Sequence, residues 1–127
     1  FGWEFYFFNT HFDHVGQVAR RESARLVVAK IEEMVGEDTP IILTGDFNTN
    51  VEDMAMAPIV LSMKDARKES PVTDNEGTFN NWGKNEKVTI IDHIFFKNLT
   101  PVSFRTVKEN YGAPYISDHY PVVFVGE

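Results

Sequence analysis

Polar residues with chemically useful side chains gather in four short clusters, each next to an apolar stretch of the chain. The clusters are residues 9–14 (Asn-Thr-His-Phe-Asp-His), 45–48 (Gly-Asp-Phe-Asn), 91–93 (Ile-Asp-His) and 117–121 (Ser-Asp-His-Tyr-Pro). All four histidines of the chain lie in three of these clusters. Catalytic side chains are commonly placed on loops at the ends of rigid elements. The concentration therefore predicts one shared site.

The residue types suit hydrolysis of a phosphoester. A histidine can accept a proton from attacking water near neutral pH when a carboxylate fixes its tautomer. Asp46 and Asn48, two residues apart on a strand, are expected to point to the same side, where one orients water and the other donates to a phosphoryl oxygen. Further carboxylates can hold a hard divalent cation, for which we expect Mg²⁺ or Mn²⁺.

Composition excludes several other classes of function. The chain of 127 residues has no cysteine, which excludes a thiolate zinc site, and it has no Gly-x-Ser-x-Gly pattern of a serine hydrolase. Its formal charge of -7 argues against a general affinity for nucleic-acid backbones. No segment approaches the roughly 18 uninterrupted apolar residues of a membrane helix, so we expect no transmembrane segment.

Strands and helices that can position the four clusters alternate along the chain. Apolar residues at three- and four-residue spacing predict a helix over about 18–35, and the polar, turn-rich residues 65–87 predict a long surface loop with an extended stretch around 78–82. A second, short helix is expected near 58–63. Buried strands are expected at 1–8 and 40–44, and further strands at 88–96, 102–107 and 120–125. This order predicts an α/β class within a single domain.

The four clusters, in this order, resemble those of the endonuclease/exonuclease/phosphatase superfamily, whose fold is that of deoxyribonuclease I. The resemblance covers nearly the whole chain and implies half of a two-layer β-sandwich flanked by helices, with a mixed or antiparallel sheet. It assigns residues 1–127 to the C-terminal half, because no segment matches the first strand or the metal-binding Glu of the N-terminal half. We therefore expect association with that absent half or with a second copy, and an isolated chain that is nearly inactive.

The resemblance also implies roles for individual residues. His119 matches the general base, or the phosphate-contacting histidine of other proposals for the family, and Asp92 matches the carboxylate that orients it. Asp46 and Asn48 match the pair that positions water and phosphate. His11 matches a histidine that stabilises the phosphoryl oxygens or the leaving group and so contacts substrate.

Three further residues near the clusters have different expectations. Asp118 matches a carboxylate on the metal side of the site. His93 replaces the commoner Tyr after the Ile-Asp pair and receives no catalytic role. Trp82, an aromatic on the predicted loop, is a candidate for lining the mouth of the site and contacting substrate.

The resulting hypothesis is a metal-dependent phosphoesterase. Its substrate is a small molecule, a lipid headgroup or a nucleic acid, and the acidic balance favours the first two. The alternatives are a phosphoester-binding module without catalysis and an inactive fragment that acts through association. The sequence does not indicate where the protein is located.

Overall fold

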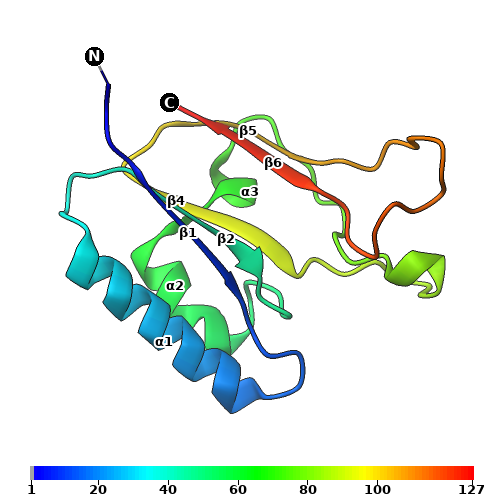
Figure 1. The fold of residues 1–127 in the computed structure, drawn as a ribbon, viewed down its shortest axis with the longest axis horizontal. Helices are drawn as coiled ribbons and strands as arrows, with labels where there is room; N and C mark the ends of the chain where they lie inside the picture. The colour runs from blue at the N-terminus through cyan, green and yellow to red at the C-terminus, as the bar shows by residue number, and fades with distance from the viewer. Residues whose placement is uncertain (1) are drawn as a thin grey trace.

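The computed structural model describes residues 2–127, which form a mixed sheet, a two-stranded ribbon and helices around them (Figure 1). The helices and strands are β1 (Tyr6–His11), α1 (Gln17–Met34), β2 (Ile41–Asp46), α2 (Ala57–Ser62), β3 (Lys64–Asp65), α3 (Ala66–Glu69), β4 (Asp92–Lys97), β5 (Pro101–Thr106) and β6 (Val122–Gly126), with short 3₁₀ turns η1 (Met54–Met56) and η2 (Asn81–Gly83). The expected mixed α/β class is confirmed.

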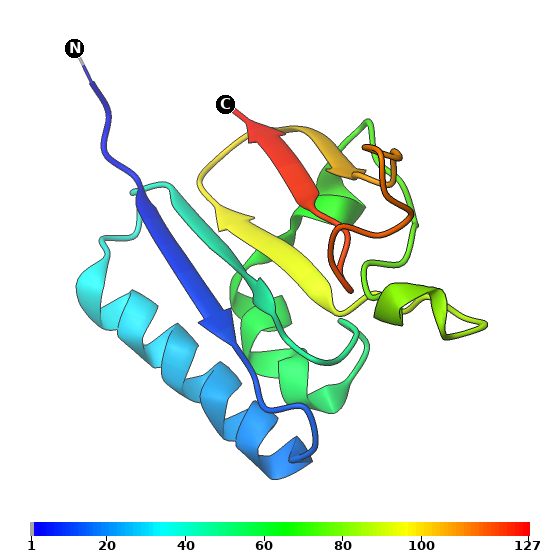
Figure 2. The same cartoon turned by 45° about the vertical axis from the view of Figure 1, so that its right-hand side comes forward.

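The main sheet has the strand order β1-β2-β4-β3. β1 runs parallel to β2, whereas β4 is antiparallel to both β2 and β3. β5 and β6 form a separate antiparallel ribbon, and Figure 2 shows this ribbon beside β4. The helix α1 lies in the crossover that joins two parallel neighbours, β1 and β2.

One face of the sheet carries the main hydrophobic core. Leu43 of β2 and Phe95 of β4 are fully buried there and pack in one cluster with Ala24 and Ile31 of α1. The ring of Phe47 meets that of Phe95 edge to face, with centroids 5.5 Å apart. Alternation along each strand therefore sends every second side chain to the opposite face, away from α1.

The opposite face carries a smaller core and then opens. Ile94 and Phe96 of β4 pack there with Ala66 of α3 and Phe104 of β5. This smaller core does not extend over β1, where Phe7 is 59% exposed. The sheet is therefore closed by helices on one side and only half covered on the other.

The first strand and the predicted loop differ from expectation. Phe1 lies outside the described residues, and β1 begins only at Tyr6 because pairing with β2 begins there; it then continues through His11. The expectation of a buried first strand is wrong, because the residues of β1 alternate between half-buried and exposed. The predicted loop 65–87 contains α3, whose first turn is capped by Asp65 accepting from the amide of Arg67 at 3.0 Å.

The later predicted elements agree in type but shift at their ends. The strand expected at 88–96 begins at Asp92, because only Thr89 before it makes an isolated bridge. The other two final strands lie within one or two residues of their expected starts. Across residues 2–127, no helix is both long enough and apolar enough to cross a lipid bilayer.

Candidate active site

Three polar side chains form one row across three neighbouring strands. His11 at the end of β1 pairs in register with Asp46 at the end of β2, and Asp46 pairs with Asp92 at the start of β4. Residues directly opposite each other in a sheet project from the same face. That face is the one opposite α1, because Leu43 and Phe95, each an odd number of positions away from its acidic neighbour on the strand, belong to the α1 core. Strand register alone therefore brings these three groups together.

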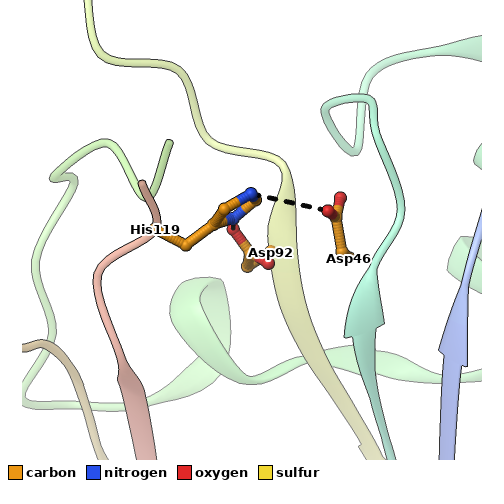
Figure 3. A group of neighbouring side chains, drawn as sticks. All are labelled: Asp46, Asp92 and His119. Atoms are coloured by element: carbon orange, nitrogen blue, oxygen red, sulfur yellow. Dashed lines mark hydrogen bonds and ion pairs between the residues drawn. The ribbon is translucent and has the colours of Figure 1, made fainter. Parts of the chain in front are cut away.

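His119 completes the cluster from the segment that leads into β6 (Figure 3). Its Nδ1 lies 2.7 Å from Oδ2 of Asp92, and its Nε2 lies 3.6 Å from Oδ2 of Asp46. An ionised carboxylate can only accept, so Nδ1 carries the proton that it donates to Asp92. In the neutral imidazole this leaves the lone pair on Nε2, on the side of Asp46. This is the tautomer that a general base requires.

The electrostatic surroundings of His119 favour its protonated form. Burial lowers the pKa of His119, but the hydrogen bond to Asp92 and the charges of Asp92 and Asp46 outweigh this effect. The net result is a pKa above the ordinary value of 6.5. A base whose pKa lies near the working pH combines sufficient basicity with a useful fraction of the neutral form.

Asp46 lies between two imidazoles. Its Oδ2 is 3.4 Å from Nε2 of His11 and faces Nε2 of His119 on the other side, while its Oδ1 accepts from the amide of Asn48 at 2.9 Å. The side chain of His11 is 73% exposed, whereas that of Asp46 is only 21% exposed. The Asp46 carboxylate is therefore half-buried and held by the backbone amide of Asn48, whereas the His11 imidazole is accessible to solvent.

Asn48 does not lie on the strand, so the expectation that it shares a side with Asp46 by strand alternation is wrong. β2 ends at Asp46, and Asn48 has a left-handed backbone with φ of 53°. Its side-chain Nδ2 donates to the carbonyl of Phe12 at 2.6 Å. Asn48 therefore ties the end of β2 to the loop after β1 and fixes Asp46 through its own amide.

Asp118 and Trp82 lie outside the cluster formed by Asp46, Asp92 and His119. The Asp118 carboxylate accepts from the neighbouring Ser117 hydroxyl at 3.4 Å, and its backbone carbonyl accepts from the amide of Asn80 at 2.8 Å. Trp82 is 50% exposed on η2, with a left-handed φ of 57°. Neither residue lines the groove described below.

His93 faces the other way. Its ring packs against Phe47 and Phe95, and its Nε2 lies 2.7 Å from the carbonyl of Thr49. Burial lowers the pKa of His93. Because it follows Asp92 on the strand, its side chain projects from the α1 face rather than toward His119.

Sequence reasoning missed a buried segment behind the cluster. Thr78 is 0% and Asn80 is 1% exposed, although both lie in the predicted surface loop. Phe79 between them contacts the His119 ring edge to face, with centroids 5.1 Å apart. The signal available in the sequence was the extended stretch expected around 78–82, with polar residues on either side of an aromatic one.

A groove of about 610 Å³ runs from this cluster between the sheet and β6. Asp46 and Asp92 line it, and Phe7, Ile42 and Phe124 contribute apolar walls. His11, Asn48 and His119 are not among the residues that line it. The groove follows the uncovered face of the sheet. Polar chemistry and exposed apolar surface therefore share one side of the molecule.

The donor set suits a hard divalent cation. One ligand atom each of Asp46, Asp92 and His119 can be chosen so that all three lie within 4.8 Å of one another. Mg²⁺ and Mn²⁺ prefer oxygen ligands, and Mg²⁺ in particular is often held by one or two carboxylates with water completing its shell. Since Nδ1 of His119 is engaged by Asp92, the two carboxylates are the better-fitting ligands.

Comparison with known proteins places the chain in a family. Residues 2–119 match the Endonuclease/Exonuclease/phosphatase family, and the chain belongs to it. This confirms the resemblance found in the four clusters, and with it the deoxyribonuclease-I-like fold. Members of this family are phosphoesterases and nucleases.

Two solved structures illustrate the similarity. The mannosyl-6-phosphatase of Bacteroides thetaiotaomicron is 34% identical, with a TM-score of 0.84 over 98% of this chain and 52% of that chain. An endonuclease/exonuclease/phosphatase from Bacteroides vulgatus is 38% identical, with a TM-score of 0.83 over 94% of this chain and 49% of that chain. An uncharacterized protein, L388, of Acanthamoeba polyphaga mimivirus is 27% identical over 98% of this chain and 50% of its own length. The chain thus spans about half the length of these relatives.

Proposed function

We propose that this chain supplies the catalytic residues of a metal-dependent phosphoesterase acting on a small phosphoester. The observation that carries the proposal is the contact of 2.7 Å between His119 and Asp92, with Asp46 on the Nε2 side of the same imidazole. Similarity to a mannosyl-6-phosphatase and the formal charge of -7 favour a sugar phosphate or another small anion over a long nucleic acid.

His119 acts as the base at its Nε2 atom. Water loses a proton to Nε2 while its oxygen forms a bond to phosphorus, and the bond from phosphorus to the leaving oxygen breaks on the opposite side. Asp92 keeps the imidazole in the required tautomer and stabilises the imidazolium that forms. Asp46 accepts a hydrogen bond from the water and so orients it for attack.

His11 and Asn48 contact the phosphoryl group. The exposed imidazole of His11 at the end of β1 can donate to a phosphoryl or leaving oxygen, which lowers the energy of developing negative charge. The amide of Asn48 carries two hydrogens, and one of them is used on the Phe12 carbonyl. We assign the second to a phosphoryl oxygen. We also assign Trp82 a substrate contact, because it is half exposed on η2, although it does not line the groove.

A divalent cation, Mg²⁺ or Mn²⁺, fits the carboxylates of Asp46 and Asp92. We assign Asp118 as a further carboxylate, because its negative charge acts on the same imidazole, His119. When bound, the cation supplies positive charge that neutralises the phosphoryl oxygens. The site residues themselves still hold the water, the proton and the substrate as described.

We also propose that residues 1–127 are the C-terminal half of a two-layer domain. The exposed side of Phe7 and the apolar walls of the groove form a surface suited to a second layer. The span of about half of each solved relative supports the same assignment. The layer is the N-terminal half or, without it, a second copy of the chain, and the isolated chain is nearly inactive for that reason.

A substrate panel on the full-length protein tests the function. Mannose 6-phosphate, a nitrophenyl phosphodiester, sphingomyelin and single-stranded DNA are each incubated with Mg²⁺ or Mn²⁺, and released product is measured. We expect turnover of a small phosphoester that chelation abolishes. Binding of the same compounds in calorimetry, without any turnover, contradicts catalysis and identifies a binding module instead.

A further inference from the structure

We propose that Thr78 is a positioning residue for the Asp92–His119 pair, acting through the buried segment Thr78–Asn80. The effect on catalysis rests on the phosphoesterase function proposed above. The positioning itself rests only on contacts of these residues, and it can be tested without activity.

The Thr78 hydroxyl holds the backbone that carries Asp92. Its Oγ1 accepts from the amides of Ile91 and Asp92, each at 3.1 Å, and donates to the carbonyl of Thr89 at 3.4 Å. A hydroxyl has one donor and two acceptor positions, so all three are used. Thr78 is fully buried, and water cannot replace these bonds. The Thr78 hydroxyl therefore holds the start of β4 in addition to the pairing of Asp92 with Asp46 on β2.

The same segment also holds the backbone that carries His119. The Thr78 carbonyl accepts from the amide of Tyr120 at 2.7 Å, and Phe79 bridges to both Thr89 and His119. Asn80 donates from Nδ2 to the carbonyl of Ser117 at 3.2 Å. Residues 78–80 thus lie as an extended spacer between the segment before Asp92 and the segment around His119.

This arrangement sets the distance across which the two side chains meet. Adjacent extended segments lie about 4.8 Å apart. The segment before Asp92 and the segment around His119 lie on either side of residues 78–80, so their backbones are about 10 Å apart, a distance that an Asp and a His side chain together can span. The edge of the Phe79 ring against the imidazole further restricts how His119 turns. Loss of the Thr78 hydroxyl leaves two buried amides without an acceptor, so the backbone at Asp92 must shift to satisfy them.

Three substitutions in the full-length protein separate the hydroxyl from its surroundings. Thr78→Val keeps the shape and removes the hydroxyl, whereas Thr78→Ser keeps the hydroxyl and removes the methyl group. Thr89→Val is the matched control, because Thr89 contributes its carbonyl to the segment and its side chain is exposed. Two quantities are measured: kcat and KM for the best substrate of the panel, and the proton resonance of His119 Nδ1–H in ¹⁵N-labelled protein, which reports the bond to Asp92.

We expect Thr78→Val to lower kcat about 10- to 100-fold, the effect of a small misplacement of catalytic groups, with a much smaller change in KM. Its Nδ1–H resonance should weaken or vanish through exchange with water. Thr78→Ser and Thr89→Val should retain both the rate and the resonance. If Thr78→Val fails to fold, Thr78→Ala is measured against Thr78→Ser in the same way.

The possible outcomes separate the two proposals. A resonance that persists in Thr78→Val together with the parent kcat overturns the positioning role, and so does an equal loss in Thr78→Ser. If the parent protein turns over no phosphoester but Thr78→Val alone loses the resonance, the positioning role stands and the proposed function is the one that fails.

Discussion

Nδ1 of His119 lies 2.7 Å from Oδ2 of Asp92, although 27 positions separate the two residues in the chain. Asp92 begins β4, whereas His119 lies in the segment before β6. Phe79 forms backbone bridges both to His119 and to Thr89, which precedes Asp92 in the chain. The pair therefore depends on tertiary structure and on no local motif. Substitutions on either side of it provide sharp tests of the proposed chemistry.

Replacement of His119 by alanine should remove the base. We expect His119→Ala to lower kcat of the full-length protein by about 10² to 10⁴, the usual contribution of a general base. His14→Ala is the matched control, because His14 is exposed and lies outside the cluster around Asp46. Hydrolysis of a nitrophenyl phosphodiester measures both. Parent-like rates in His119→Ala would show that the role is wrongly assigned.

That His11, Asp46 and Asp92 share one site could be predicted from the sequence, because each lies in a polar cluster next to an apolar stretch. Their alignment in one row could not, because the strands expected at 1–8 and 88–96 do not end at His11 or begin at Asp92. The position of Asn48 could not, since it depends on a left-handed residue just past the strand and on a bond to Phe12 far earlier in the chain.

Short or non-local features account for the other misses. β3 and α3 have two and four residues, too few for a periodic pattern, so the sequence predicts a loop over most of this segment. Thr78 is polar and surrounded by turn residues, and its burial depends on hydrogen bonds that its hydroxyl and its backbone make with residues elsewhere in the chain. Hydropathy carries no information about such bonds.

Part of the loss of stability on acidification should come from Asp53. The hydrogen bond from the Thr49 hydroxyl, followed by that from the Ala55 amide, lowers the pKa of Asp53 below its ordinary value of 3.8. A carboxyl whose pKa is lowered by folding stabilises the protein above its unfolded pKa, and this contribution is lost as the pH falls through the folded pKa. Asp53→Asn should therefore lower the free energy of unfolding at pH 7, and the difference from the parent should shrink below about pH 4.

Urea unfolding at a series of pH values measures this difference. Asp38→Asn is the control, because Asp38 is an exposed acidic residue outside the regular elements. A difference between parent and Asp53→Asn that stays constant from pH 7 to pH 3 contradicts the role of the lowered pKa.

A second acidic residue, Asp74, should stabilise the junction of α3 and β5. Its Oδ1 accepts from Arg67 at 2.8 Å, and its Oδ2 accepts from the amide of Thr106 at 2.7 Å. The Arg67 side chain is only 9% exposed and stacks over the Phe104 ring, 4.4 Å from its centroid. Asp74→Ala leaves this buried cation without its carboxylate and should lower the free energy of unfolding by about 2 kcal/mol.

The surface pair of Arg105 and Glu109 offers a comparison for Asp74→Ala. Both side chains are largely exposed, and exposed ion pairs contribute little to stability. Glu109→Ala should leave the urea midpoint unchanged. If the two variants were equally stable, the junction would not depend on the buried partner.

Cation binding should depend on the two carboxylates of the row. Asp46 and Asp92 face each other in register on β2 and β4, and together with His119 they offer ligand atoms within 4.8 Å. Because a hard cation needs charged oxygen ligands, Asp46→Asn and Asp92→Asn should each weaken Mn²⁺ affinity more than about tenfold in calorimetric titration of the full-length protein. Asp38→Asn should leave the affinity unchanged.

Asp92→Asn should also weaken the Nδ1–H resonance of His119, whereas Asp46→Asn should preserve it, because only Asp92 accepts that proton. Unaltered Mn²⁺ affinity in both variants would place the cation elsewhere, with Asp118 as the next carboxylate to replace.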